Sequence, residues 1–310
     1  MSYTARSQER GDAPFDPELR AALAVIGGVF PPTVTRELIP FMRRSYASPP
    51  REELLDGRDV GVEEIEIPVP GATLGASIVR PSSGTAGAGI LLLHSGGMMF
   101  GDRFSGADHA LGWVEDFGVA LLTVDYRLAP EHPFPAAIVD TLTVLDAVRD
   151  GNLGLATEAA APIALVGTSS GANIATVAAM ADAARRPASP LRGLGLLVPS
   201  VLLTRVPDGE AALRVRRQQL RGYLGELALD DPWASPGVLP RIAGLPPTFA
   251  AIASADEVAA GGESLCAAIE AGGGEATARI YEMTHTTATP AVEAAMIGEL
   301  AAAMRDALHP

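Results

Sequence analysis

The sequence predicts an α/β fold in which a mostly parallel sheet is covered by helices on both faces. Five short, almost wholly apolar runs occupy residues 90–93, 119–124, 163–166, 194–198 and 249–253. A helix-length segment separates each run from the next, and this alternation is typical of a parallel sheet buried on both sides. A hairpin pattern before the runs and one candidate strand after them bring the expected total to eight strands.

Composition and charge narrow the class of protein. The 310 residues are 48% apolar and 19% charged, which is globular and long enough for one large α/β domain with attachments, or for two domains. A net charge of −14 argues against nucleic-acid binding and does not favour an anionic membrane surface. The one cysteine, Cys266, rules out an internal disulfide and a cysteine-based metal site.

No targeting or membrane-spanning segment is expected. The first twelve residues lack the apolar core of a secretory signal. No apolar run reaches the roughly 20 residues that a membrane-spanning helix needs. The sequence therefore predicts a cytoplasmic protein without membrane insertion.

Two helical patterns come before any strand. The first begins at Asp16-Pro17, an N-cap followed by a first-turn proline, and runs to Ile26. The second covers residues 38–42 and stops before Pro49-Pro50. We therefore expect residues 1–55 to form a helical attachment, and residues 56–310 to form the sheet domain.

The strand patterns at the two ends of the sheet differ from the apolar runs. Residues 65–69 alternate between apolar and polar, and residues 74–79 follow a turn at Gly71, which predicts an antiparallel hairpin. A last strand is expected at 278–281, after three glycines, and a closing helix at 291–307.

An insertion interrupts the alternation at about residues 204–229. Its helical pattern is rich in arginine, and Arg214, Arg217 and Arg221 fall on one helix face. We interpret this face as solvated. The alternative is a clamp for an anionic substrate.

A strand-turn-helix pattern near the middle of the chain predicts a nucleophile. The apolar run 163–166 breaks at Gly167, and a helical pattern resumes after Gly171. Ser169 is the centre of this Gly-x-Ser-x-Gly pattern, in which small neighbours allow a sharp, strained turn. Such a turn holds a hydroxyl above the edge of the sheet, over the first N–H groups of a helix.

A serine nucleophile needs a base and an acid that orients the base. Only two histidines follow Ser169. His309 is one residue from the end of the chain, and His285 lies just after the last expected strand. Asp256 follows the run 249–253 at its carboxyl end, where catalytic groups gather in a parallel sheet. Its neighbour Glu257 is the rival acid, and the alternative role for Asp256 is a turn or N-cap.

The loop after the run 90–93 predicts an oxyanion hole. It reads His-Ser-Gly-Gly-Met-Met-Phe-Gly-Asp from His94, and the backbone N–H groups of Gly96 and Gly97 are sterically open. The N–H of Ser170, directly after the nucleophile, is the expected third donor. We expect His94 to hold this loop in place and not to act as a base.

At these residues the chain resembles the hormone-sensitive-lipase-like branch of the α/β-hydrolases, bacterial esterase family IV. The loop at His94 is similar to its His-Gly-Gly-Gly signature, and Gly-Thr-Ser-Ser-Gly is similar to its Gly-Thr-Ser-Ala-Gly subgroup. Further similar segments are Val-Asp-Tyr-Arg-Leu-Ala-Pro-Glu-His-Pro-Phe-Pro-Ala at 124–136, Asp-Pro-Trp-Ala-Ser-Pro at 231–236 and Gly-Leu-Pro-Pro at 244–247. The resemblance extends from about residue 60 to the end.

This resemblance implies an α/β-hydrolase fold with an eight-stranded sheet and a site at its carboxyl edge. It implies Ser169 as nucleophile, Asp256 as acid, His285 as base, and Gly96, Gly97 and Ser170 as oxyanion donors. Residues 1–55 and 204–229 would form a helical cap over the site. Tyr126, Arg127 and Glu131 would be scaffold. A homodimer through the strand 278–281 would be compatible with the family.

Four departures from the family pattern bear on the substrate. Ser95 replaces the first signature glycine, and Met98-Met99 stand where an aromatic is common, so Ser95 and Met98 are candidate pocket residues. The segment after Asp256 lacks a proline and a second aspartate. Thr286-Thr287 replaces Gly-Phe after the base. We expect these changes to affect substrate shape more than catalytic capacity.

The predicted function is a serine carboxylesterase that hydrolyses small esters with short or medium acyl chains, without a metal or organic cofactor. The first alternative is an amide or lactone hydrolase, or an acyltransferase, that uses the same three residues. A remote alternative is a non-catalytic small-molecule receptor. Such receptors in plants share the fold but have lost the base, whereas His285 is present here.

Overall fold

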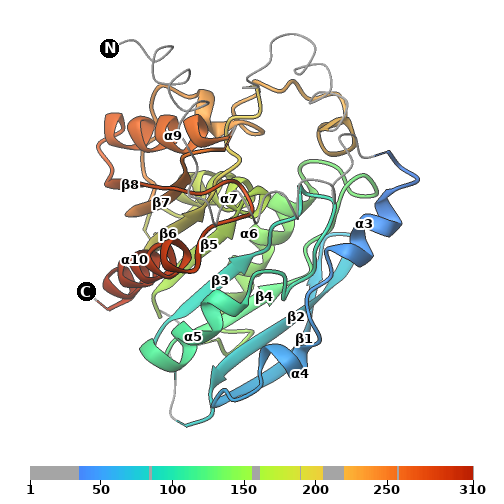
Figure 1. Cartoon of the computed structure of the whole chain (residues 1–310), viewed down its shortest axis with the longest axis vertical. Helices are drawn as coiled ribbons and strands as arrows, with labels where there is room; N and C mark the ends of the chain where they lie inside the picture. Colours follow the sequence, from blue (N-terminus) through green and yellow to red (C-terminus); the bar gives the residue numbers. More distant parts are fainter. Residues whose placement is uncertain are drawn as a thin grey trace.

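The computed structural model contains one eight-stranded sheet with the strand order β1-β2-β4-β3-β5-β6-β7-β8 (Figure 1). It describes residues 35–83, 86–155, 161–188, 190–204, 220–256 and 258–309. The strands are β1 (Val60–Val69), β2 (Ala72–Pro81), β3 (Gly89–Leu93), β4 (Ala120–Val124), β5 (Ile163–Thr168), β6 (Gly193–Leu197), β7 (Thr248–Ala253) and β8 (Ala276–Tyr281). The predicted fold class and all eight expected strands are confirmed.

The pairing of the strands also follows the prediction. β1 and β2 form an antiparallel hairpin from Val60↔Pro81 to Val69↔Ala72, closed by a turn in which Gly71 has a φ of +79°. β2 pairs with β4 antiparallel, and every later pairing in the sheet is parallel. The carboxyl ends of six strands, β3 to β8, therefore meet at one edge of the sheet.

β8 begins two residues before the expected start of the strand. It pairs with β7 from Thr248↔Ala276 to Ala253↔Tyr281, so backbone pairing and not the apolar pattern determines its length. It is one of the two edge strands of the sheet, and its central residues are exposed, including Ile280 at 53%. An exposed edge strand carries a weak hydrophobic signal, which explains the short prediction.

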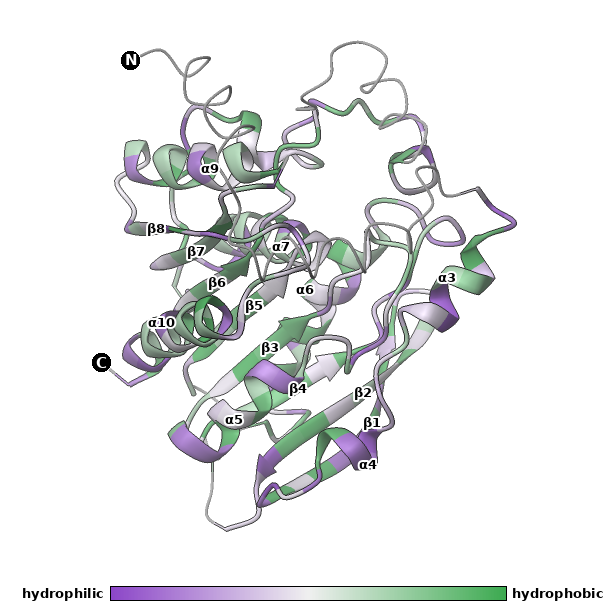
Figure 2. Ribbon diagram, in the orientation of Figure 1, coloured by the Kyte–Doolittle hydropathy of each residue, from purple (hydrophilic) through white to green (hydrophobic). Residues whose placement is uncertain are grey.

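Five long helices cover the two faces of the sheet. Helices α6 (Ala136–Arg149), α7 (Ser170–Arg185) and α9 (Ala259–Ala271) pack into one hydrophobic cluster, and α5 (Asp108–Phe117) and α10 (Pro290–Leu308) pack into the other. Figure 2 shows the central strands as apolar along their length, whereas the helices carry both apolar and polar residues. The sheet is thus buried on both faces, as continuous apolar strands require.

The described part of the N-terminal attachment contains two short helices. α3 (Ile39–Ser45) matches the second expected helix, and the first expected helix, 16–26, lies outside the described residues. α4 (Arg51–Leu54) was not expected. It begins directly after Pro49-Pro50, because proline is tolerated where a helix starts. The division of the chain at residue 55 stays a prediction.

Of the insertion at 204–229, the structure describes residue 204 and residues 220–229. Leu220, Tyr223 and Leu224 are buried, and the backbone N–H of Phe134 donates to the carbonyl oxygen of Tyr223 over 2.7 Å. Arg221 is exposed, in keeping with a solvated face, and Arg214 and Arg217 lie outside the described residues. Across the parts of the chain that the structure describes, no helix is both long and apolar enough to span a bilayer.

Candidate active site

Ser169 occupies a strained turn between β5 and α7. Its φ of 55° and ψ of −113° are unusual for a residue with a side chain, a conformation that costs about 1–3 kcal/mol and persists only where the surroundings hold it. The N–H of Ser169 donates to the carbonyl oxygen of Leu197 over 2.8 Å, and its own carbonyl oxygen accepts from the N–H of Ala172 over 3.1 Å. These bonds hold the backbone on both sides of the hydroxyl.

The two glycines of the turn are required by close backbone approach. A Cβ at Gly167 would collide with the backbone of Gly171, the second residue of α7. A Cβ at Gly171 would collide with the carbonyl oxygen of Leu93, at the end of β3. Only glycine lets α7 start this close to both strands.

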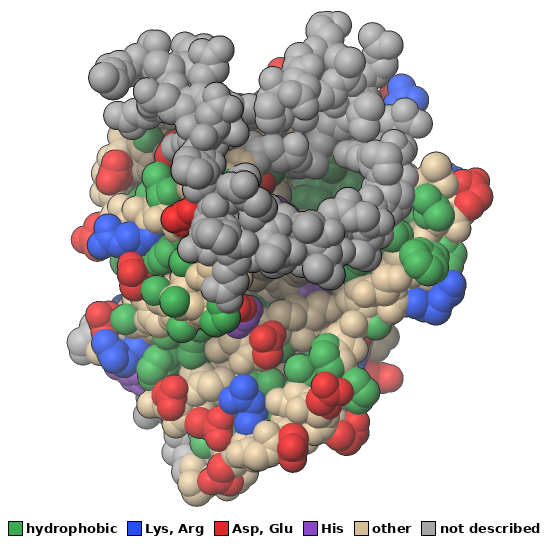
Figure 3. Space-filling model, viewed as in Figure 1, with side chains coloured by type: hydrophobic (Ala, Val, Ile, Leu, Met, Phe, Trp, Pro, Cys, Tyr) green, Lys and Arg blue, Asp and Glu red, His purple; other side chains and the backbone are tan. Residues whose placement is uncertain are grey.

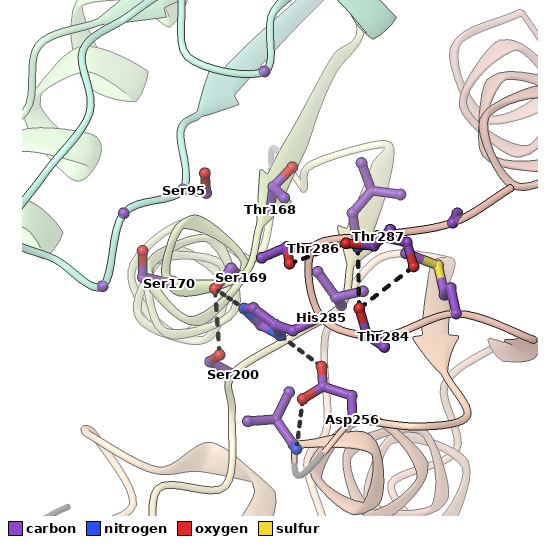
Figure 4. Close-up of a pocket in the computed structure, with 18 of the residues that line it drawn as sticks. Ser95, Thr168, Ser169, Ser170, Ser200, Asp256, Thr284, His285, Thr286 and Thr287 are labelled. Atoms are coloured by element: carbon purple, nitrogen blue, oxygen red, sulfur yellow. Dashed lines mark hydrogen bonds and ion pairs between the residues drawn. The ribbon is translucent and has the colours of Figure 1, made fainter. Parts of the chain in front are cut away.

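A chain of short hydrogen bonds joins Ser169, His285 and Asp256. Ser169 Oγ lies 2.7 Å from His285 Nε2, and His285 Nδ1 lies 2.6 Å from Asp256 Oδ2 (Figure 4). The carboxylate can only accept, so Nδ1 carries the proton and Nε2 accepts from the serine hydroxyl. The side chain of Asp256 is 3% exposed and that of His285 is 35% exposed, so the acid is buried and the base faces the cleft.

The ends of β7 and β8 place the acid and the base side by side. Asp256 follows the end of β7 by three residues, and His285 follows the end of β8 by four. The N–H of Ser254 donates to Tyr281 O over 2.9 Å, and that of Ala255 donates to Met283 O over 3.0 Å, so the two loops are bonded to each other. This is the edge of the sheet at which the sequence predicted the site.

A tight turn presents His285 at its tip. The N–H of Thr284 donates to Thr287 O over 2.9 Å, and the N–H of Thr287 donates to Thr284 Oγ1 over 3.2 Å. Asp256 also accepts from the N–H of Val258 through Oδ1 over 3.1 Å. Asp256 therefore serves both as a turn residue, through Oδ1, and as the partner of His285, through Oδ2. The rival acid, Glu257, lies outside the described residues.

The glycine loop after β3 lies against the same cleft. Gly96 has a φ of +125° and Gly97 a φ of +60°, and Phe100 N–H closes a turn onto Gly96 O over 2.9 Å. Ser95, Gly96, Gly97, Met98 and Ser170 line the hollow into which Ser169 points. The structure thus brings the expected oxyanion donors and both candidate pocket residues to the nucleophile. Their roles in the reaction stay predictions.

His94 is buried behind this loop. Its ring stacks on Tyr126 with centroids 4.1 Å apart, Nδ1 lies 2.7 Å from Ser95 O, and the Tyr126 hydroxyl donates to His94 O over 2.8 Å. Burial lowers the pKa of His94, so the neutral ring donates through Nδ1 to the loop carbonyl. The ring supports the loop from behind, as the sequence led us to expect.

Asp102 anchors the far end of the loop. Its carboxylate accepts from the N–H of Ser48 over 2.8 Å and from the N–H of Phe104 over 3.0 Å. Burial raises the pKa of Asp102, but these donors lower it by a larger amount. The pKa of Asp102 is therefore below its usual value. An ionised Asp102 therefore ties the glycine loop to the segment after α3.

Ser200 is a site residue that the sequence reasoning missed. It is buried, its Oγ lies 3.5 Å from Ser169 Oγ, and its N–H donates to Ser169 O over 3.2 Å (Figure 4). Asn173 Nδ2 in turn donates to Ser200 O over 3.0 Å. A serine two residues after the run 194–198, at the carboxyl edge of the sheet, was the available signal.

The cleft beside Ser169 has a volume of about 1010 Å³. Figure 3 shows acidic side chains scattered over the lower half of this face of the molecule. Within the described ranges, no group of three or more His, Cys, Asp or Glu side chains is arranged to hold a metal ion.

The fold and the arrangement around Ser169 are those of an α/β-hydrolase. Residues 90–288 match the family described as the alpha/beta hydrolase fold, and the chain belongs to that family. The match agrees with the hormone-sensitive-lipase-like branch expected from the motifs. The Gly-Thr-Ser-Ala-Gly subgroup stays a prediction.

Named relatives of this chain are ester hydrolases. It is 30% identical over 234 residues to the carboxylic ester hydrolase LipN of Mycobacterium tuberculosis, an alignment that covers 69% of this chain and 60% of LipN. It is 34% identical over 182 residues to the esterase LipI of the same organism, covering 54% of this chain and 55% of LipI. The chain thus spans 60% or less of the length of these two relatives.

A solved esterase superposes over nearly the whole chain. The esterase of Pyrobaculum calidifontis has a TM-score of 0.79 and 25% identity, and the superposition covers 94% of this chain and 99% of that one. A bacterial heroin esterase, at 23% identity and a TM-score of 0.78, shows the same fold.

Proposed function

We propose that this protein is a serine carboxylesterase that hydrolyses small-molecule esters through an acyl-enzyme on Ser169. The observation that carries the proposal is the continuous hydrogen-bonded chain from Ser169 Oγ through His285 to the buried Asp256. A serine hydroxyl is a poor nucleophile until a base takes its proton, and this chain supplies both the base and the group that orients it.

The first half of the reaction uses His285 as a base and then as an acid. His285 Nε2 takes the hydroxyl proton as Ser169 Oγ attacks the ester carbonyl carbon. Asp256 stabilises the imidazolium ion that results. The tetrahedral oxyanion is received by the N–H groups of Gly96, Gly97 and Ser170, each of which is worth about 2.7–4 kcal/mol of transition-state stabilisation. His285 then returns the proton to the leaving alcohol.

The second half repeats these steps with water. His285 deprotonates a water molecule, the resulting hydroxide attacks the acyl carbon, and the acid product leaves as Ser169 regains its proton. No step calls on a metal or an organic cofactor. The absence of a cofactor, the homodimer and the cytoplasmic location all stay predictions.

The relatives and the cleft support the proposal. LipN and LipI are named as an ester hydrolase and an esterase, and both match this chain at 30% identity or more. A volume of about 1010 Å³ accommodates an ester with a short or medium acyl chain, since pockets for drug-sized ligands measure about 300–1,000 Å³. The chain length of the acyl group is part of the proposal.

Ser169→Ala tests the proposal with p-nitrophenyl butyrate as substrate. We expect turnover to fall by at least about 10³-fold, because only binding and the oxyanion donors remain. Circular dichroism and the unfolding midpoint of the variant provide the control for folding. Activity near that of the wild type would refute the assignment. Labelling of the wild-type protein by a fluorophosphonate, absent in the variant, separates a hydrolase from a receptor.

A further inference from the structure

The cleft beside Ser169 has two chemically different sides. One side is apolar and includes Phe100, Leu203 and Leu220, which pack with the cluster on the α6, α7 and α9 face of the sheet. The opposite side belongs to the α5 and α10 face. Its lining comprises His109, Met283, Thr286, Thr287, Glu293 and Met296.

The side formed by α5 and α10 carries a carboxylate whose ionic partner, among the described residues, is a histidine. Glu293, on the first turn of α10, is 50% exposed, and its Oε1 lies 3.9 Å from His109 Nε2. The sequence has no lysine, and no arginine is among the described residues that line the cleft. The other lining carboxylate, Asp256, is bonded to His285. Among the described residues that line this side, the charge is therefore negative.

Glu293 also stabilises its own helix, which limits the size of the effect. A carboxylate in the first turn of a helix interacts favourably with the helix dipole, and Asp108 has the same place on α5. The positive ends of two helices thus offset part of the acidic charge. A half-exposed carboxylate, partly offset and screened by solvent, is expected to change the rate for a charged substrate by about two- to fivefold.

We propose that Glu293 is a specificity-determining residue that favours esters bearing a cationic group, such as a quaternary ammonium. The methyl groups of such a cation would contact Met296 and Met283, whose flexible thioether side chains adapt to irregular apolar shapes. Its charge would face the Glu293 carboxylate at the rim. This inference rests on the proposed esterase function and names a substrate class for it.

The test compares pairs of esters that differ only in charge. Butyrylcholine and 3,3-dimethylbutyl butyrate have the same shape, with nitrogen replaced by carbon in the second. The p-nitrophenyl esters of 4-(trimethylammonio)butanoic acid and 5,5-dimethylhexanoic acid place the same difference on the acyl side. For at least one pair, we expect kcat/KM of the wild type to be about two- to fivefold higher for the cationic ester.

Glu293→Gln should bring this ratio close to one. Glu299→Gln is the matched control, because Glu299 lies on the same helix and pairs with Arg279 at the surface over 3.2 Å. The control should keep the preference of the wild type. The pair of esters that shows the preference identifies which end of the substrate lies along α10.

Three results overturn the inference. If both neutral esters are hydrolysed and neither pair shows a preference, the cleft does not select cations and the esterase proposal stands. If Glu293→Gln keeps the preference, the selectivity comes from other residues. If no ester of either pair is hydrolysed, the proposed function fails, and the inference fails with it.

Discussion

Gly171→Ala tests how closely α7 must approach β3. Judged by helix propensity alone, alanine in place of a helical glycine stabilises a protein by about 1 kcal/mol. In α7, however, the new Cβ would collide with Leu93 O and lie 2.5 Å from His94 O, whereas ordinary contact begins at 3.4 Å. Both obstacles are backbone carbonyl groups, which cannot rotate away as a side chain can. We therefore expect a net loss of about 1–3 kcal/mol in the free energy of unfolding.

The same substitution should also reduce activity. Relief of the clash requires the start of α7 to move by about 1 Å or more, and Ser170 is the first residue of that helix. A shift of this size withdraws the Ser170 N–H from the proposed oxyanion position. Loss of one such donor lowers kcat by about 10²–10³-fold.

Gly298→Ala is the matched control. Gly298 lies within α10, and a Cβ there would meet no atom within 4 Å. Alanine should stabilise the protein by up to about 1 kcal/mol and leave kcat unchanged. The two variants are thus expected to shift stability in opposite directions.

Urea unfolding followed by circular dichroism measures both free-energy changes, and p-nitrophenyl butyrate hydrolysis measures kcat. An unchanged m-value shows that each variant unfolds over the same buried surface. If Gly171→Ala is as stable and as active as the wild type, the close approach of α7 to Leu93 is not required, and the argument for this glycine is refuted.

Three further predictions concern the acid, a buried ion pair and pH. Asp256→Asn should lower kcat by up to about 10⁴-fold with the fold retained, and a residual activity above a tenth would contradict its role. Asp182→Ala should reduce the free energy of unfolding, measured by urea titration, by about 3–5 kcal/mol. The substitution breaks an ion pair with Arg149 in which both side chains are under 10% exposed. A loss below about 1 kcal/mol would contradict this expectation. Burial lowers the pKa of His94 in the folded state, so the unfolded chain takes up the proton first as the pH falls. Unfolding midpoints should therefore decrease as the pH drops below about 6.5, less steeply for His94→Asn, and equal slopes in the two proteins would show that His94 does not contribute.

The elements that the sequence located well are those whose signal is local. The run 163–166, the glycines at 167 and 171 and the helical pattern after them lie within one segment, so the elbow at Ser169 was predictable from neighbouring residues. The apolar strands were equally evident, because a strand buried on both faces has no polar position. Their ends were less certain. β5 ends two residues after the predicted run and β8 begins two residues before it, because pairing with a neighbouring strand extends past the apolar pattern.

The parts that the sequence did not reveal depend on contacts between distant segments. β4 lies between β2 and β3, so the order of strands in the sheet differs from their order in the chain. Ser200 approaches the nucleophile from the end of β6, and Glu293 approaches the cleft from α10. Neither residue belongs to a recognisable motif. Each lies beside the cleft only because the folded sheet brings distant segments together.

Local sequence patterns predict the strand-turn-helix at Ser169, the glycine loop after His94, and a histidine and an aspartate after later strands. These are properties of short segments, governed by backbone conformation and by the burial of apolar side chains. The folded chain alone brings Asp256, His285 and Ser169 within hydrogen-bonding distance and sets an acidic side of the cleft opposite an apolar one. The reason is physical: parallel strands bring the carboxyl ends of remote segments to one edge, and a distance across that edge is not encoded in any single segment.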